Sequence, residues 1–198
     1  MEIKKIAIVL ADISGYTEFI QSHKTAMIHA EHIISQLLEI VIDQAEYPLI
    51  LNKLEGDAIL LYSELGDSET DAIRDITNQV NTFFSVFHKE LNTLSEFTVA
   101  NCPCEACQTA GRLKLKAILH KGNVIFKKIR QFEELAGEEM IFAHRLLKNN
   151  VSSREYILMS EPFYLLLDNE LYNSSKLHQE TYDGFGTVNL KVFYPKIH

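Results

Sequence analysis

Runs of apolar residues divide the chain into strands and helices. The residues from Ile6 to Ala11 are all apolar, which predicts a strand buried on both of its faces. Over 26–45, and again after Ser68, apolar residues return every three or four positions, as expected of helices with one side packed on a core. In chain order the predicted elements are strand 3–11, helix 16–21, helix 26–45, strands 49–54 and 58–62, helix 68–94, strands 112–120 and 123–127, helix 137–148, strand 156–159, helix 161–167 and strand 187–194.

The order of these elements indicates the fold class. Pairs of strands joined by predicted turns at 55–56 and 121–122 are separated by helices. This order predicts an α+β fold with helices covering a mostly antiparallel sheet, since a doubly wound parallel sheet would need regular alternation of strand and helix. We interpret the phenylalanine-rich stripe of the long helix as core packing. An irregular insertion at about 96–111 follows that helix and holds all the cysteines.

Composition and charge narrow the class of protein. With 198 residues, 46% of them hydrophobic, the chain suits a single domain over 1–198 with a full core. A net charge of −8 argues against nucleic acid as a partner and leaves a site for metal-bound phosphate open. The sequence has no signal-peptide pattern and no apolar run near the roughly 18 residues that cross a membrane. We therefore expect a cytoplasmic protein that does not insert into membranes.

Two acidic residues stand at the ends of predicted strands. Asp12 closes the first apolar run, just before a predicted helix start whose N–H groups attract anions. Asp57 begins the second strand of the first hairpin, after a turn at Gly56. If this hairpin pairs beside the first strand, both carboxylates reach one ion, and such oxygen ligands together with phosphate suit Mg²⁺ or Mn²⁺. The alternatives are that Asp12 caps the helix and that Asp57 is a polar turn residue.

Four segments, in this order, resemble motifs of class III adenylate and guanylate cyclase catalytic domains. Residues 11–17, Ala-Asp-Ile-Ser-Gly-Tyr-Thr, are similar to the first metal motif, Asp-Ile-x-Gly-Phe-Thr, and residues 53–57, Lys-Leu-Glu-Gly-Asp, to the second, Lys-x-x-Gly-Asp. Residues 115–122 resemble the strand that ends in His-Gly, and residues 137–146 the helix Gly-x-x-Val-Asn-x-Ala-x-Arg. More narrowly, the likeness is to a group of uncharacterised bacterial cyclase-like proteins. It implies a ferredoxin-like, cyclase-type sandwich.

The resemblance implies a site for a purine nucleoside triphosphate and two divalent ions, Mg²⁺ or Mn²⁺. Asp12 and Asp57, with the carbonyl oxygen of Ile13, would hold the ions. The residues whose backbone N–H groups would cradle the triphosphate are Gly15, Tyr16 and Thr17. The implied reaction is attack of the ribose 3′-oxygen on the α-phosphorus, which releases pyrophosphate and forms a cyclic nucleotide.

The resemblance implies roles in base recognition and catalysis for three further residues. Lys53 matches the residue that reads the purine in adenylate cyclases, and Glu134 falls at the position of its partner, where Asp is usual. Arg145 matches the arginine that stabilises the transition state. Because the two halves of the site come from different subunits in that family, a homodimer is implied. From the residues alone, Lys53 also fits a strand-edge lysine, Glu134 a solvated loop acid, and Arg145 a helix arginine favoured by the dipole.

One position departs from the family pattern in a way that affects function. Ile141 replaces the Asn that orients the ribose, and loss of one orienting contact can lower a rate about a hundredfold. The basic residue that reaches the triphosphate from the last strands of the family has no clear match here, and Lys191 is only a candidate for it. We therefore weigh two functions: a homodimeric, metal-dependent purine nucleotide cyclase, and a catalytically inactive cyclase-like module that binds nucleotide or metal and signals by dimerisation.

The cyclase resemblance leaves the cysteine segment unexplained. Cys102, Cys104 and Cys107 offer three thiols in a short loop, which suggests a second metal or thiol site. Zn²⁺ or an iron–sulfur cluster needs four ligands, so a histidine or a second subunit would have to complete it. The alternatives are reduced thiols without metal or a redox switch, and a metal or thiol sensor is a third functional hypothesis. His29 and His32 share one helix face, but no third ligand lies near them in the sequence.

Overall fold

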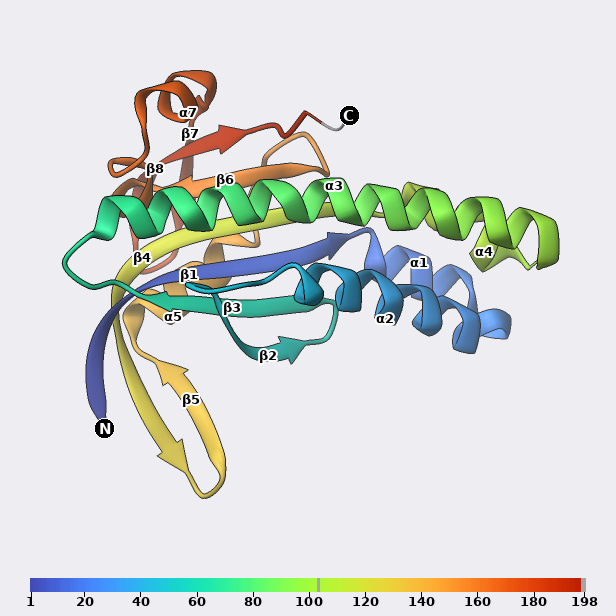
Figure 1. Ribbon diagram of the computed structural model, residues 1–198, viewed down its shortest axis with the longest axis horizontal. Helices are drawn as coiled ribbons and strands as arrows, with labels where there is room; N and C mark the ends of the chain where they lie inside the picture. Colours follow the sequence, from blue (N-terminus) through green and yellow to red (C-terminus); the bar gives the residue numbers. More distant parts are fainter. Residues whose placement is uncertain (103, 197–198) are drawn as a thin grey trace.

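One curved sheet forms the centre of the molecule (Figure 1). The computed structural model describes residues 1–102 and 104–196, without the side chains of residues 95, 97–101 and 169. Within these residues the sheet has eight strands in the order β2-β3-β1-β4-β6-β8-β7, with β5 paired to β4. The strands are β1 (Glu2–Ser14), β2 (Ile50–Glu55), β3 (Ala58–Glu64), β4 (Lys114–Ile129), β5 (Phe132–Ala136), β6 (Tyr156–Ser160), β7 (Lys176–Tyr182) and β8 (Gly186–Phe193). Neighbouring strands are antiparallel except β4 and β6, which confirms the predicted mostly antiparallel sheet.

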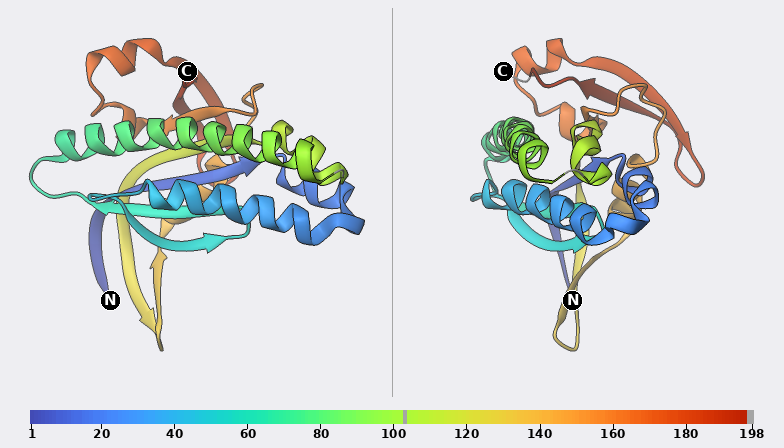
Figure 2. Two further views of the ribbon diagram at one scale, coloured as in Figure 1. Left: turned by 45° about the vertical axis from the view of Figure 1, so that its right-hand side comes forward. Right: turned by 90° about the vertical axis from the view of Figure 1, so that its right-hand side faces the viewer.

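Helices cover both faces of this sheet, as Figures 1 and 2 show. The two longest helices, α2 and α3, lie side by side on one face, and α5 packs against β1 and β4 on the other. The helices are α1 (Tyr16–Ser22), α2 (Met27–Asp43), α3 (Glu69–Asn101), α4 (Glu105–Thr109), α5 (Glu138–Leu146), α6 (Glu161–Tyr164) and α7 (Asn169–Ser174), with 3₁₀ turns η1 (Lys24–Ala26) and η2 (Ala110–Arg112). In the described part of the chain, no helix combines the length and the apolar character needed to span a membrane.

The central strand β1 contributes to two hydrophobic cores. Val9 packs in the core under α2 and α3, whereas Ile8 and Leu10 pack in the core under α5. Successive side chains of a strand point to opposite faces, so a strand with helices on both sides must be apolar at every position. The residues from Ile6 to Ala11 are all fully buried, which confirms the prediction of a strand buried on both faces.

The phenylalanine-rich stripe of α3 lies in the core, as predicted. Phe83, Phe84 and Phe87 expose 1% or less of their surface, and all three belong to the core cluster under α2 and α3. The pattern predicts that the helix ends at residue 94, whereas α3 continues to Asn101. The stripe is therefore a structural feature and takes no part in the candidate site.

The segment expected to be irregular, at about 96–111, is mostly helical where it is described. It contains the end of α3, the short helix α4 and the turn η2, while Pro103 lies outside the described residues. Ala106 and Cys107 of α4 are buried in the core cluster. A helix this short is stabilised by such packing rather than by local propensity, which explains why the sequence pattern did not indicate it.

The predicted turn at 121–122 is wrong. β4 continues through this point to Ile129, because β1 pairs with it over a long ladder that places Ile6 opposite Gly122. The chain turns instead at Arg130, whose φ is 56°, and returns as β5, which the sequence pattern does not predict. It also does not predict α7 or β7, since β7 is an edge strand rich in polar residues. Strand pairing outweighs local turn preference here.

Candidate functional site

Asp12 lies near the end of β1, and Asp57 lies beside it in the β2–β3 turn. The prediction that Asp57 begins the returning strand is wrong, because β3 starts at Ala58, so Asp57 is a polar turn residue as the alternative had it. The ladder between β1 and β3 places Asp12 opposite Ala58, the residue after Asp57. The N–H group of Ile13 donates a hydrogen bond to the carbonyl oxygen of Asp57 over 3.2 Å, which holds the hairpin turn against the end of β1. The structure therefore brings together two carboxylates that are far apart in the sequence.

The electrostatics of this carboxylate pair favour a cation. Burial raises the pKa of Asp57 to about 6, repulsion from the Asp12 carboxylate adds to the rise, and the Lys116 ammonium opposes it. Lys116 lies opposite Asp12 in the ladder between β1 and β4, with its Nζ 3.0 Å from Asp12 Oδ2. One ammonium thus partly compensates two carboxylates, and this set of hard oxygen donors fits Mg²⁺ or Mn²⁺. Sequence reasoning missed Lys116, because only the strand register places it here.

Helix α1 begins just after the end of β1. Gly15 precedes the helix with a φ of 94°, a conformation that favours glycine, and no side chain caps the helix. Tyr16 and Thr17 form the first turn. Asp12 is a strand residue, so the alternative that it caps α1 is wrong. Sequence reasoning missed Arg154, from the loop before β6, which lies beside Gly15: a Cβ atom there would be 3.6 Å from Arg154 Nη1.

Lys53 and Glu134 are in contact, although 81 positions separate them in the sequence. Lys53 Nζ, on β2, donates to Glu134 Oε2, on β5, over 2.8 Å. This hydrogen bond lowers the pKa of Glu134 and raises the pKa of Lys53. Glu134 is therefore a strand residue in an ion pair, and the alternative of a solvated loop acid is wrong.

A second carboxylate, that of Glu55, extends this contact to α5. Glu55 lies with Oε1 3.4 Å from Lys53 Nζ, and its Oε2 is 2.7 Å from His144 Nε2. The other ring nitrogen of His144 lies 2.7 Å from the carbonyl oxygen of Met140. The sequence did not single out Glu55 for this role, and it gave His144 no partner, because the contact depends on how α5 packs beside β2.

Arg145 and Ile141 lie on α5 over an open cavity of about 660 Å³. Ile141 is 57% exposed, although isoleucine is apolar. In the described part of the chain no carboxylate forms an ion pair with Arg145. His144 also lines this cavity, whereas neither Asp12 nor Asp57 does. The arginine and the carboxylate pair of one chain therefore do not share this cavity.

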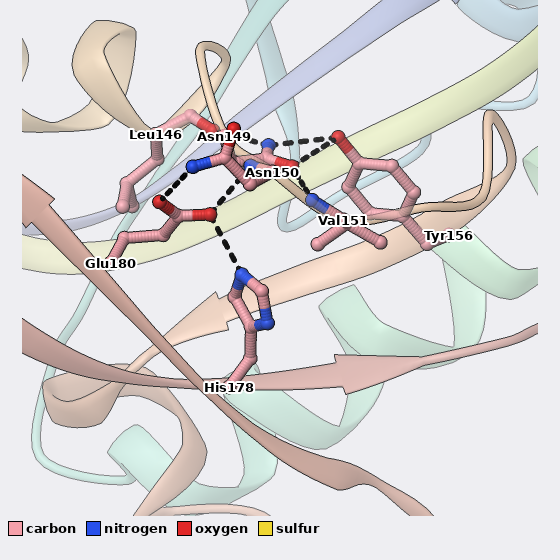
Figure 3. Close-up of polar contacts among 7 residues, drawn as sticks. All are labelled: Leu146, Asn149, Asn150, Val151, Tyr156, His178 and Glu180. Carbon is pink, nitrogen blue, oxygen red and sulfur yellow. Dashed lines mark hydrogen bonds and ion pairs between the residues drawn. The ribbon is translucent and has the colours of Figure 1, made fainter.

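Partly buried polar contacts hold the C-terminal end of α5 (Figure 3). Glu180, on β7, accepts a hydrogen bond from the backbone N–H of Asn150 over 2.5 Å and another from its Nδ2 over 3.1 Å. Asn149 Nδ2 donates to the carbonyl oxygen of Leu146 over 2.7 Å, and Tyr156 donates from its hydroxyl to Asn149 Oδ1 over 3.0 Å. These contacts tie the end of α5 to β6 and β7, and so fix the position from which its arginine extends.

The His-Gly motif of β4 holds the other end of α5. His120 is buried, with Nδ1 2.7 Å from Ser160 Oγ and Nε2 2.7 Å from Glu139 Oε2 in the first turn of α5. Gly122 leaves room for this carboxylate, since a Cβ atom there would lie 2.5 Å from Glu139 Cδ. The motif therefore positions α5, and His120 is a core histidine with both ring nitrogens in contact with polar partners.

Lys191 is held away from solvent. Its Nζ donates to the carbonyl oxygen of Tyr172 over 2.6 Å and lies 3.4 Å from the centre of the Tyr172 ring. The residue is 8% exposed. These contacts commit its ammonium to α7, so the geometry does not favour it as the residue that reaches a triphosphate.

The three cysteines converge with His29, which the sequence analysis left without a partner. One ligand atom of each of these four residues lies within 4.8 Å of the other three. All three cysteines are free of disulfide bonds. The three thiols and one imidazole together form a candidate metal centre.

Comparison with known sequences gives one family and one curated relative. The profile of the family described as "Protein of unknown function (DUF2652)" matches residues 34–156. The uncharacterised protein Rv2561/Rv2562 of Mycobacterium tuberculosis (strain ATCC 25618 / H37Rv) is 30% identical over 156 residues, which cover 79% of this chain and 70% of that protein. The profile match includes Asp57 and the cysteine segment, and it begins after Asp12.

Solved structures of nucleotide cyclases have the same fold. The adenylyl cyclase CyaB from P. aeruginosa matches with a TM-score of 0.64 and 18% identity, over 98% of this chain and 96% of that one. The guanylyl cyclase Cya2 matches with a TM-score of 0.68 and 12% identity, over 96% of this chain and 92% of that one. At these identities the likeness shows the fold alone, and it confirms the expected cyclase-type α+β architecture.

Proposed function

The chain belongs to the DUF2652 family, and we propose that it is a metal-dependent purine nucleotide cyclase that acts as a homodimer. The observation that carries this proposal is the meeting of Asp12 and Asp57 at one end of a cyclase-type sheet. The contact between Lys53 and Glu134 supports it independently, because the cyclase resemblance pairs these two positions for base recognition.

The carboxylate pair forms the metal half of the proposed site. Asp12 and Asp57, with the carbonyl oxygen of Ile13, would hold two Mg²⁺ or Mn²⁺ ions. When bound, such ions supply positive charge at the attacking and leaving oxygens. Lys116 places its ammonium 3.0 Å from the Asp12 carboxylate, so it adds positive charge beside the proposed metal ligands.

The start of α1 would receive the triphosphate. The backbone N–H groups of Gly15, Tyr16 and Thr17 are the proposed donors to phosphate oxygens, since the first N–H groups of a helix lack partners within the helix. Arg154 adds positive charge beside Gly15. Its guanidinium also lies 3.2 Å from the exposed carboxylate of Glu18, a contact that a phosphate would compete with.

The nucleotide half of the proposed site comes from β2, β5 and α5. Lys53 would donate to an acceptor on the purine edge, and Glu134 would accept from a purine N–H group. The ribose 3′-hydroxyl would lose its proton to water, its oxygen would bond to the α-phosphorus, and the bond from that phosphorus to the pyrophosphate oxygen would break. Arg145 would stabilise the negative charge that develops on the α-phosphoryl oxygens.

A head-to-tail homodimer would join the two halves. The cavity beneath Arg145 has neither Asp12 nor Asp57 among its lining residues. A complete site would therefore combine the carboxylate pair of one protomer with Arg145 of the partner subunit. Each dimer then has two equivalent sites, as expected for a symmetric pair.

The exposed Ile141 favours a second candidate, a catalytically inactive module that binds nucleotide or metal and signals by dimerisation. Isoleucine offers no hydrogen bond to a ribose, and its exposure over the cavity means that core packing does not explain it. This candidate keeps the metal half of the site and the base-reading pair. It differs from the first only in lacking turnover.

The deciding experiment is incubation of the purified protein with ATP or GTP and Mn²⁺, followed by chromatography for a cyclic product. Asp12→Asn and Asp57→Asn each remove one negative metal ligand with little change in shape. Asp183→Asn is the matched control, because Asp183 is an exposed residue of the β7–β8 turn. We expect the two ligand variants to lose at least about a hundredfold in rate and the control to keep the wild-type rate.

The outcomes separate the two candidates. A cyclic product from the wild type and the control alone supports the cyclase. A product that persists in Asp12→Asn counts as contamination and contradicts the proposal. Binding of nucleotide that requires Mn²⁺, without any product, favours the inactive module.

A further inference from the structure

Four side chains with metal-binding atoms meet where the end of α3 and the helix α4 lie beside the N-terminal part of α2 (Figures 1 and 2). Cys102 follows α3, Cys104 is the residue before α4, and Cys107 lies within α4. His29 belongs to the first turn of α2. The cyclase proposal uses none of these residues, so their convergence needs its own explanation.

The distances from His29 to two of the sulfurs match those of a tetrahedral zinc site. His29 Nδ1 lies 3.4 Å from Cys104 Sγ and 3.5 Å from Cys102 Sγ. With Zn–S bonds of about 2.3 Å and Zn–N bonds of about 2.0 Å, tetrahedral angles place sulfur and nitrogen about 3.5 Å apart and two sulfurs about 3.8 Å apart. All four ligand atoms lie within 4.8 Å of one another, so a small inward shift satisfies every bond.

Hydrogen bonding does not account for the position of His29. A neutral imidazole nitrogen accepts one hydrogen bond, yet the Nδ1 atom of His29 faces the sulfurs of both Cys102 and Cys104. Disulfide bonding does not account for the grouping of the cysteines either, because all three are free. A cation at the centre of the cluster would contact all four atoms at once.

We propose that Cys102, Cys104, Cys107 and His29 bind one Zn²⁺ ion as a structural site. Three thiolates and one imidazole are soft and borderline ligands that select Zn²⁺ over Mg²⁺ or Mn²⁺, so this site and the carboxylate pair take different metals. The four protein ligands fill the tetrahedron and leave no position for a substrate, which is the mark of a structural rather than a catalytic zinc. An iron–sulfur cluster would ordinarily need a fourth cysteine, and the sequence has three.

The metal would fasten α4 to α2, and through α4 it would support α1. Thr109, the last residue of α4, has its hydroxyl 3.1 Å from His23 Nε2. His23 Nδ1 lies 2.5 Å from the carbonyl oxygen of Phe19 in α1. The zinc site would thus stabilise a packed unit of α1, α2 and α4 by linking segments that are distant in the sequence.

The test uses Zn²⁺ and Co²⁺ as probes of the full-length protein. Zinc content is measured on the purified protein, and Co²⁺ then replaces the metal, since tetrahedral thiolate coordination gives cobalt a charge-transfer band and intense visible bands. His29→Gln removes one ligand. His32→Gln is the matched control, because His32 lies on the same face of α2 and lines the neighbouring cavity but is not part of the cluster. His29→Cys restores a fourth ligand.

We expect about one zinc per chain in the wild type and in His32→Gln, with the tetrahedral cobalt spectrum in both. His29→Gln should bind Zn²⁺ at least about a hundredfold more weakly, since even an outer-sphere partner contributes roughly 10–100-fold. His29→Cys should regain zinc and shift the cobalt charge-transfer band, which separates loss of a ligand from loss of the fold. A chelator should lower the melting temperature of the wild type and leave that of His29→Gln unchanged.

Two results would overturn the proposal. The first is a wild-type protein that takes up neither Zn²⁺ nor Co²⁺ under reducing conditions. The second is a His29→Gln variant with the zinc content and cobalt spectrum of His32→Gln. Neither result bears on cyclase activity, so this test is independent of the one for the proposed function.

Discussion

Replacing Asp57 by Asn should stabilise the metal-free protein at neutral pH. The side chain keeps its shape and an acceptor oxygen, but it loses the charge that burial and Asp12 both disfavour. Functional carboxylates held close together are expected to reduce stability when their cation is absent. The gain in unfolding free energy therefore measures how strongly burial and Asp12 disfavour the Asp57 charge that the metal ion would compensate.

The structure sets the size and the pH window of this effect. A rise in the pKa of Asp57 from 3.8 to about 6 corresponds to at most about 3 kcal/mol. Because the carboxylate is only half-buried and Lys116 lies nearby, solvent and that ammonium screen the repulsion, and we expect about 1–2 kcal/mol. Since the folded-state pKa is raised, the stability contributed by protonation is present below the unfolded value near 3.8 and is lost as the pH rises through about 6.

Urea unfolding in the presence of a chelator provides the assay. At pH about 7.5, Asp57→Asn should have the higher unfolding free energy, and at pH about 4 most of this difference should be gone. Asp183→Asn should follow the wild type at both pH values. Added Mn²⁺ should then stabilise the wild type and the control by mass action but not Asp57→Asn.

Two results would refute this reasoning. If Asp57→Asn is less stable than the wild type at pH about 7.5 without metal, the carboxylate is engaged in a favourable structural contact. If Mn²⁺ stabilises the variant and the wild type equally, the ion binds elsewhere, and the assignment of the carboxylate pair fails.

Three further predictions concern the candidate site and the contacts that hold α5 in place. Mixing inactive Asp57→Asn and Arg145→Ala proteins should restore up to about a quarter of wild-type activity. Half of the randomly formed dimers contain both variants, and each of these has one intact site out of two. No recovery after subunit exchange would contradict a site shared between subunits. Ile141→Asn should raise the rate of cyclic-product formation by up to about a hundredfold. Its stability should equal that of the wild type, since Ile141 is exposed. An unchanged rate in a folded variant would mean that this position does not orient the ribose. Burial acts to raise the pKa of Glu180, but the donors from Asn150 and His178 outweigh it and hold that pKa below its usual value. Glu180→Gln should therefore lose about 1.5–3 kcal/mol at neutral pH, and the difference should disappear as the pH falls through the lowered pKa of the wild-type carboxyl; denaturation across that range is the check.

The sequence by itself determined the elements whose side chains repeat with a clear period. The run from Ile6 to Ala11 predicted a strand covered on both faces, because such a strand is apolar at every position. The stripe of α3 predicted a helix on a core, because burial of one helix face imposes a period of three to four residues. The motifs around Asp12 and Asp57 were also recognisable from the sequence, because each lies within a few consecutive residues. The order of the predicted elements indicated an α+β fold, and the resemblance then implied a cyclase-type sandwich.

Only the tertiary structure decided which distant residues meet. Strand register placed Lys116 beside Asp12, pairing with β1 carried β4 through the expected turn at Gly122, and helix packing brought His29 to the three cysteines. None of these contacts can be recognised in the local sequence. Each involves only one or a few residues from each element, and whether they meet depends on how the strands and helices pack. Hydrophobic periodicity specifies each element in turn, whereas the candidate metal centres depend on pairs of residues that only the packed sheet and helices bring within a few ångströms.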